Sequence, residues 1–552
     1  MEAVDSKGTS MSITMKYIAA LMLLLVSVIP ANMYSFKQQM KKYKVNMHMK
    51  IENEKLVDSN NVVALFDENN YSFFKNKPSN KYDVEWHEVF DHVNERLQWE
   101  SVNKANQSSL DNIFKFLPIQ SLDSNSLFND SIFLLIDIHH NYDMNVIDFL
   151  RNQKNTKSVI CFNTSDELLK YEFYNEYNVR KSNFIMNYIN KILKNRVYKD
   201  ETMVNLVKDL YNRKSFDDLV FMIMILIDNF IKPIKSVISV TSTASTTTEQ
   251  MKCMTSKCQK ELISCLKDES CRKALNCLNG CKGNDQVCSY KCITSYESKK
   301  FQSFAYCILQ KNNCMENSAL IPVYPNPTPL QSFRREKVTW DVADDIFIGY
   351  LKTSNNNLIA NNMLDWSWKV VCGANAAYDC FSCQHQIFYK DKGDHFWYDP
   401  VFKVLTLDNK EVWRRRHYRV IRDTKSLPGT YYFSVLDNGV KSNEWWKIID
   451  ADDDLQWALF YYSGAAAAAG TSYSGALIVT KDGNWPNMND ETYNRIKNAM
   501  SNCGIKLWEM YPVDNTNCDE DCLAGKPPLG IKSKIKVNDA NVDNDDCNNC
   551  DL

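Results

Sequence analysis

The sequence has little net charge, few glycines and prolines, and a composition poor in long hydrophobic runs. Its 552 residues carry a formal charge of -2 at pH 7, which excludes the chain-wide basic field that drives non-specific nucleic-acid binding. A mean hydropathy of -0.41 with 44% apolar residues excludes a polytopic membrane protein but allows sizeable soluble cores. Glycine (15) and proline (14) are scarce, so those present mark turns and spacers. The length predicts about three or four folding units.

The first sixty residues have the pattern of targeting segments. Lys16 precedes an apolar stretch that ends before Pro30, which predicts a signal peptide or an uncleaved signal anchor over 1–31. Residues 32–59 are rich in lysine, and the first acid among them is Glu52. A plastid transit segment and an Asn/Lys-rich linker both fit this stretch, and the sequence leaves the two open.

Residues 60–238 form an additional N-terminal region to which the sequence assigns no function. Buried strands are expected over 131–138 and 158–162, with a helix over 145–150 between them, which indicates an α/β arrangement. A nine-residue apolar run over 219–227 is too short to span a bilayer, so we interpret it as a core helix.

Ten of the 19 cysteines lie between Cys253 and Cys314, after a Ser/Thr-rich linker at 239–249. They predict a small, all-α, disulfide-rich domain over 250–320 in an oxidising compartment. Two cysteine pairs are spaced four residues apart, so each pair lies on one face of a helix, and two such helices folded back on each other form nested disulfides. Zinc is the alternative, but this stretch has no CxxC pair and no histidine, so no metal is expected. The expected disulfides are Cys253–Cys271, Cys258–Cys265, Cys277–Cys292, Cys281–Cys288 and Cys307–Cys314.

A proline-containing spacer at 321–334 leads into a part rich in aromatic and β-branched residues, 335–520. Eight runs separated by turn signals predict an up-and-down antiparallel barrel, and a helix capped by Asp490 follows. Eight strands and then a helix is the lipocalin order, and such a barrel is wide enough for one small apolar ligand. The acidic tail at 521–552 is expected to be disordered. The expected strands are 368–372, 383–389, 396–407, 411–421, 429–436, 444–449, 456–463 and 473–480.

The cysteine spacing from Cys253 to Cys314 resembles, nearly gap for gap, the cysteine-rich domain of the violaxanthin de-epoxidase family. The resemblance covers about residues 250 to 520 and implies a multidomain protein with a lipocalin-like barrel. It also implies an enzyme that reductively opens xanthophyll epoxides at acidic pH, with ascorbate as co-substrate and reductant. A second signature is similar to the opening of the family's barrel: Trp368-x4-Gly373-x-Asn375-x2-Tyr378-Asp379-x-Phe381-x-Cys383-Gln384.

The same resemblance assigns roles to individual residues. Glu444 falls where the family has an aspartate and is the expected general acid, because opening an epoxide needs a carboxyl that is neutral near the working pH. The alternative for Glu444 is a solvated charge at a strand end. The family's late-strand tyrosine falls on Val479, which cannot donate a proton. A disulfide Cys383–Cys518 is also implied. Ligand contacts are expected from Gln384, Trp446, Tyr462, Asp379 and Trp368.

The resemblance favours a violaxanthin de-epoxidase-like oxidoreductase, and two other functions stay open. A non-catalytic lipocalin-type binder of a hydrophobic ligand is favoured by Val479 and by Ser382, where the family has an aspartate. An unrelated disulfide-rich structural or interaction protein is the third. The expected partner is a hydrophobic small molecule such as a xanthophyll, and nucleic acid is not expected. Transient contact with a membrane surface and a homodimer both stay open. The expected location is the plastid, reached through the secretory pathway, with secretion or an endomembrane lumen as the alternative.

Overall fold

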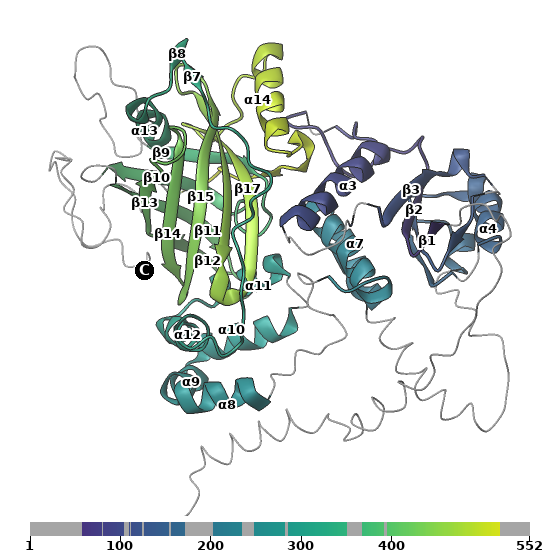
Figure 1. The fold of residues 1–552 in the computed structure, drawn as a ribbon, viewed down its shortest axis with the longest axis horizontal. Coiled ribbons are helices and arrows are strands. Elements are labelled where there is room, and N and C mark those ends of the chain that lie inside the picture. Colours follow the sequence, from purple (N-terminus) through teal and green to yellow (C-terminus); the bar gives the residue numbers. More distant parts are fainter. Residues whose placement is uncertain are drawn as a thin grey trace, which may run out of the picture.

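The structure is a computed structural model that describes residues 58–79, 81–103, 110, 112–123, 126–153, 156–171, 203–234, 248–281, 285–349, 367–390 and 395–518. The signal segment, nearly all of the basic segment and of the Ser/Thr-rich linker, and the acidic tail expected from the sequence lie outside these residues. Figure 1 shows three groups of elements: a small sheet with helices, a helical cluster and a β-barrel.

The N-terminal group is a parallel sheet of four strands in the order β3-β2-β5-β6. Alternate residues of β2 face two separate apolar clusters, one containing α3 and α7 and the other containing α4. This arrangement confirms the expected α/β character of the region. The elements are β2 (Val62–Phe66), α3 (Trp86–Asn103), β3 (Phe114–Pro118), β5 (Ile132–Ile136), α4 (Asp143–Arg151), β6 (Ser158–Phe162) and α7 (Phe216–Phe230), with a small parallel pair β1 (Asp58–Ser59) and β4 (Phe128–Asn129) and a short helix α5 (Asp166–Leu169).

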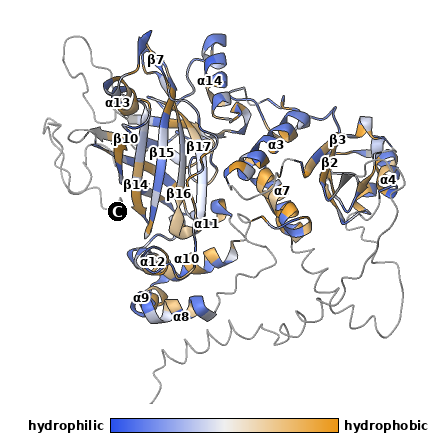
Figure 2. Ribbon diagram, viewed as in Figure 1, coloured by the Kyte–Doolittle hydropathy of each residue, from blue (hydrophilic) through white to orange (hydrophobic). Residues whose placement is uncertain are grey.

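The apolar run at 219–227 is the centre of α7, and nearly all of its side chains are buried. Figure 2 shows hydrophobic residues along this helix. Ser215 begins the helix because its hydroxyl accepts the N–H of Asp218. Among the described residues, no helix combines the length and the apolar character that a membrane span requires.

The cysteine-rich segment folds into five short helices and a π-helical turn, η5 (Tyr306–Lys311). Disulfides Cys277–Cys292 and Cys281–Cys288 join α10 to α11, as the four-residue spacing leads us to expect. The helices are α8 (Thr248–Lys257), α9 (Gln259–Lys267), α10 (Glu269–Gly280), α11 (Gln286–Ser295) and α12 (Lys299–Ala305).

The expected pairs Cys253–Cys271, Cys258–Cys265 and Cys307–Cys314 are wrong. Helices α8 and α9 pack against α12 and η5 rather than forming a nested ladder of their own. This packing brings distant cysteines together, and the structure contains Cys253–Cys314, Cys258–Cys307 and Cys265–Cys271, with Cα–Cα separations of 5.5, 5.8 and 5.3 Å. The sixth bond, Cys383–Cys518, is the one that the family resemblance implies.

The barrel closes because β9 pairs with both β17 and β10. Eight antiparallel strands form the wall in the order β10-β11-β13-β14-β15-β16-β17-β9, which confirms the expected barrel with its C-terminal helix. The strands are β9 (Ser367–Gly373), β10 (Ser382–Lys390), β11 (His395–Leu405), β12 (Glu411–Arg415), β13 (Tyr418–Arg422), β14 (Thr430–Asp437), β15 (Val440–Ala451), β16 (Trp457–Ala466) and β17 (Thr471–Thr480).

Two local expectations are corrected. The single strand expected over 411–421 is two strands, β12 and β13, which pair with opposite halves of β11. The break faces Pro400, which has no N–H to donate to a continuous ladder. The helix α14 (Asp490–Asn502) is capped by Asn489, whose side chain accepts the N–H of Thr492, and not by Asp490.

Helices cover both ends of the barrel (Figure 1). At one end, α13 (Trp340–Ile348) inserts Phe347, which stacks on Tyr431 at 4.5 Å between ring centres. There Asp344 is fully buried and pairs with Arg422. Helices α10, α11 and α12 lie against the opposite end, where Arg414 donates to the backbone carbonyl of Thr294 at 2.9 Å. A hairpin, β7 (Ser332–Phe333) and β8 (Glu336–Lys337), precedes α13.

The N-terminal group docks on the barrel through α3 and α7 (Figure 1). The segment after α14, η8 (Leu507–Glu509) and β18 (Tyr511–Pro512), carries Trp508 into the apolar cluster of the N-terminal sheet. The Trp508 ring lies 4.9 Å from Phe74 and 5.2 Å from Phe216, and its N–H donates to Glu88 at 2.7 Å. Trp508 is only 4% exposed, so it belongs to the core of a region more than 270 residues away in sequence.

Candidate functional site

A cavity of about 320 Å³ lies where the helical cluster meets the open end of the barrel. Barrel strands supply aromatic and polar walls, and helices α10, α11 and α12 supply an apolar cover that includes Leu278, Ile293 and Phe301. Of the residues expected to bind ligand, Gln384, Trp446, Tyr462 and Asp379 line this cavity, and so does the expected acid Glu444. The structure therefore brings five residues from separate parts of the barrel sequence to one place.

Glu444 is held inside the cavity by hydrogen bonds from neighbouring side chains. The indole N–H of Trp446 donates to Oε2 at 2.6 Å, and the hydroxyl of Tyr473 donates to Oε1 at 2.8 Å. The residue is only 5% exposed, so it is not a solvated charge at a strand end. Burial raises the pKa of Glu444 above its ordinary value, while hydrogen bonds from Trp446, Tyr473 and Tyr418 oppose the rise. The carboxyl is therefore shifted toward its neutral form.

The contact between Glu444 and Tyr473 depends on the glycine between them. Glu444 on β15 pairs with Gly464 on β16, and Gly464 pairs with Tyr473 on β17, so the three form one row across the sheet. A Cβ atom on Gly464 would lie 2.6 Å from Cε2 of Tyr473 and 2.7 Å from Cγ of Glu444. The absent side chain of Gly464 thus leaves room for the two outer residues to meet.

Asp379 is a second buried carboxyl in the same cavity. Tyr462 donates its hydroxyl to Oδ1 at 2.8 Å, and the backbone N–H of Asn375 donates to Oδ2 at 2.8 Å. Burial raises the pKa of Asp379 to about 8. The hydrogen bonds from Tyr462 and Asn375 act against this rise, and the nearby carboxyls of Asp217 and Glu444 add to it. At neutral pH this carboxyl is mostly protonated.

Two residues that the family resemblance draws attention to do not line the cavity. Trp368 is fully buried at the other end of the barrel, where its N–H donates to the carbonyls of Ile346 and Phe347 at 3.2 Å. The interpretation of Trp368 as a ligand contact is therefore not supported by its position. Val479 is fully buried in the apolar interior of the barrel and pairs with Ala458.

Sequence reasoning missed several residues that line the cavity. Tyr473, Gln386 and Tyr418 come from the barrel, and Tyr290 comes from α11. Gln386 could have been found from the sequence, because side chains two residues apart on a strand share a face and Gln386 lies two residues after Gln384.

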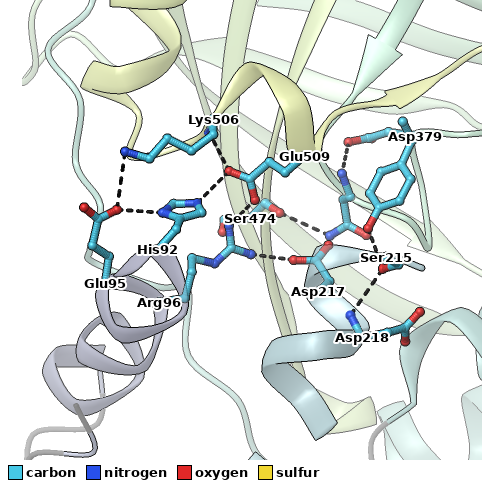
Figure 3. A network of polar contacts seen from close by, with 12 residues as sticks. His92, Glu95, Arg96, Ser215, Asp217, Asp218, Asp379, Ser474, Lys506 and Glu509 are labelled. Carbon is cyan, nitrogen blue, oxygen red and sulfur yellow. Dashed lines mark hydrogen bonds and ion pairs between the residues drawn. The ribbon is translucent and has the colours of Figure 1, made fainter. Parts of the chain in front are cut away.

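A buried polar network connects the N-terminal group to the loop that carries Asp379 (Figure 3). Arg96 on α3 donates to Asp217 on α7 at 2.5 Å and to Glu509 of η8 at 3.3 Å. His92 contacts Glu509 at 2.9 Å, and although burial acts to raise the pKa of Glu509, His92 and Arg96 hold it below its ordinary value. Asp217 accepts a backbone hydrogen bond from Ala376, three residues before Asp379.

One group of cysteines has the proximity of metal ligands. The sulfurs of Cys281, Cys288 and Cys292 lie within 4.8 Å of one another, but all three are already bound in disulfides. A disulfide sulfur is not the thiolate that binds zinc.

Residues 250–515 match the family model described as the VDE lipocalin domain. Chloroplastic violaxanthin de-epoxidases from Arabidopsis thaliana, Nicotiana tabacum and Spinacia oleracea are 21%, 21% and 24% identical to the chain. The matches cover 49%, 52% and 50% of this chain and 54%, 53% and 52% of the relatives, so the chain spans about half the length of the curated relatives it matches.

Among solved structures, insecticyanin from Manduca sexta is 12% identical with a TM-score of 0.23, and the match covers 35% of this chain and 86% of insecticyanin. The family match falls on the same residues as the cysteine register and the barrel-opening signature. Over residues 250–515 the chain is therefore similar to the violaxanthin de-epoxidase family.

Proposed function

We propose that this protein is a violaxanthin de-epoxidase-like oxidoreductase that opens a xanthophyll epoxide with ascorbate as the reductant. The observation that carries the proposal is Glu444, a buried carboxyl in an aromatic cavity whose pKa is raised by burial. A carboxyl of this kind can hold a proton at the pH where the reaction runs and release it to the substrate.

The overall reaction removes one oxygen from the substrate. The epoxide oxygen takes up protons as its two C–O bonds break and leaves as water, a carbon–carbon double bond forms, and ascorbate loses two electrons and two protons to become dehydroascorbate. Glu444 is the proton donor to the epoxide oxygen in this proposal. The hydrogen bonds from Trp446 and Tyr473 fix the direction in which its carboxyl points.

Tyr473 compensates in this proposal for the hydroxyl that is missing at Val479. Both residues lie on β17, but Tyr473 lines the cavity and its hydroxyl is 2.8 Å from Glu444. Asp379 and Tyr462 form a second carboxyl–tyrosine pair across the same cavity, and the raised pKa of Asp379 keeps that pair protonated at neutral pH.

The location that suits this function is a plastid compartment, reached through the secretory pathway. The named relatives are chloroplastic, and six disulfides among the described residues fit an oxidising lumen. Secretion or an endomembrane lumen is the alternative. We assign no role in the reaction to residues 60–238 beyond their contact with the barrel.

The test compares the full chain with a Glu444→Gln variant, which keeps the size of the side chain and removes its acidity. Both are incubated with a xanthophyll epoxide and ascorbate near pH 5, and the de-epoxidised product is separated by chromatography. We expect product with the unmodified chain and at least a hundredfold slower formation with Glu444→Gln, since general acid catalysis typically contributes about 10²–10⁴-fold. The matched control is Glu411→Gln, an exposed glutamate on β12.

A second function is a lipocalin-type binder without catalysis. It is favoured by the apolar surroundings of Val479, which leave no hydroxyl at that point of β17. Binding of the xanthophyll epoxide by the unmodified chain, without product at any pH from 4 to 8, would support this function and contradict the enzymatic one.

A further inference from the structure

We propose that the cavity recognises a hydroxyl group on its ligand through two glutamines of β10. Gln384 accepts a hydrogen bond from this hydroxyl, and Gln386 donates one to it. This inference rests on the proposed function only for the choice of probe. It makes Gln386 a residue that determines ligand specificity. The expected ligand is an apolar ring or chain that carries a hydroxyl group.

Gln386 is the first half of this pair. Its side chain is fully buried and lines the cavity, and its Oε1 atom accepts the hydroxyl of Tyr398. Its Nε2 atom is buried and makes no hydrogen bond within the described protein. A buried amide nitrogen without an acceptor destabilises a protein, so its presence in a cavity indicates an acceptor supplied by a ligand.

Gln384 is the other half, and its free atom has the opposite character. The side chain is 5% exposed and lines the cavity, and its Nε2 atom donates to the carbonyl of Tyr378 at 3.2 Å. Its Oε1 atom is buried without a donor. This atom therefore requires a ligand group that donates a hydrogen bond.

The geometry of the strand places the two free atoms near one ligand group. Gln384 lies within a register shift between Ser382 and His385, and from His385 onward β10 pairs regularly with β11 and β9. The side chains of Gln384 and Gln386 both line the cavity. Residues two apart on a strand are separated by about 6.5 Å, which a single oxygen can bridge between two amide side chains. A hydroxyl both donates and accepts, whereas an epoxide or ether oxygen only accepts.

The cavity wall also contains apolar side chains and a donor that already has an acceptor. Phe402 and Leu477 line the cavity, and the N–H of Trp446 is bonded to Glu444. A hydrocarbon without the hydroxyl would bury the two amide atoms and leave both without partners. Sites built in this way discriminate strongly against the analogue that lacks the polar group.

The test measures binding of two ring compounds that differ by one hydroxyl, β-ionone and 3-hydroxy-β-ionone, to the full chain. Quenching of tryptophan fluorescence reports binding, because Trp446 lines the cavity. We expect 3-hydroxy-β-ionone to bind at least tenfold more tightly than β-ionone. The variant is Gln386→Met combined with Tyr398→Phe, because the second change removes the hydroxyl that would otherwise lose its acceptor.

In this double variant the preference is expected to fall below threefold, mainly through weaker binding of the hydroxylated compound. Gln384→Met, which leaves the Tyr398 contact intact, is expected to reduce the preference as well and serves if the double variant does not melt cooperatively. The matched control is Gln456→Met, an exposed glutamine at the start of β16, which should keep the full preference.

Equal affinities in the unmodified chain, no binding of either compound at millimolar concentration, or a preference that persists in folded Gln384 and Gln386 variants would each overturn the inference. The readout is binding, so it separates this inference from catalysis. A chain that prefers the hydroxyl but opens no epoxide supports the inference and contradicts the proposed enzyme. A chain that opens epoxides without the preference does the reverse.

Discussion

Substituting alanine for Gly464 tests the row of residues that positions the proposed acid. The new Cβ atom would lie 2.6 Å from Tyr473 and 2.7 Å from Glu444, well inside an ordinary van der Waals contact. One or both side chains must move away, and the 2.8 Å hydrogen bond between them is then lost. Overpacking a core costs about 1–3 kcal/mol, and a hydrogen bond between neutral groups contributes about 0.5–1.5 kcal/mol.

The expected loss in the free energy of unfolding for Gly464→Ala is therefore about 1.5–4.5 kcal/mol, measured by urea denaturation. Gly280→Ala is the matched control, because a Cβ atom there has no neighbour within 4 Å. It should change stability by no more than about 1 kcal/mol. If Gly464→Ala were as stable as the unmodified protein and kept its affinity for a cavity ligand, the proposed row across the three strands would be refuted.

Three further changes have outcomes that follow from the described contacts. Tyr473→Phe removes a donor that favours the ionised form of Glu444, so the infrared band of the protonated Glu444 carboxyl should persist to higher pH. If the band were lost at the same or a lower pH, the hydrogen bond from Tyr473 to Glu444 would be contradicted. Arg96→Met leaves the buried carboxyl of Glu509 and the partly buried carboxyl of Asp217 without their shared cation, and should destabilise the fold by about 3 kcal/mol in urea. The exposed Arg151→Met should stay within about 0.5 kcal/mol, and equal losses would show that the network contributes nothing. The pKa of Asp379 is raised to about 8, so the folded state holds a proton that the unfolded state releases above about pH 4. The melting temperature should therefore fall between pH 4 and pH 8. A fall of the same size in Asp379→Asn would show that other groups cause the pH dependence.

The parts of the fold that sequence predicted well are those governed by local rules. The pairs Cys277–Cys292 and Cys281–Cys288 follow from one helical periodicity and one tight turn between α10 and α11. The bond Cys253–Cys314 depends on which helices pack together, and spacing alone does not rank the many possible connectivities.

The site was predictable to the extent that single positions match a family motif. Glu444 and Trp446 could be placed by resemblance, but Tyr473 could not, because its contact runs through the register of three strands and a glycine. Trp368 shows the opposite limit: it belongs to a motif, yet its indole bonds to the carbonyls at the end of α13, a helix that the strand pattern did not predict.

The position of Trp508 has a consequence for how the protein can change over time. Its ring packs against Phe74 and Phe216. A smaller residue at either position would therefore leave a cavity next to η8. Sequence change at Phe74 and Phe216 is therefore constrained by a tryptophan that lies more than 270 residues further along the chain. If the barrel were moved alone into another protein, the indole of Trp508 would lose its cover and be exposed to water. A polar residue would then have to replace it.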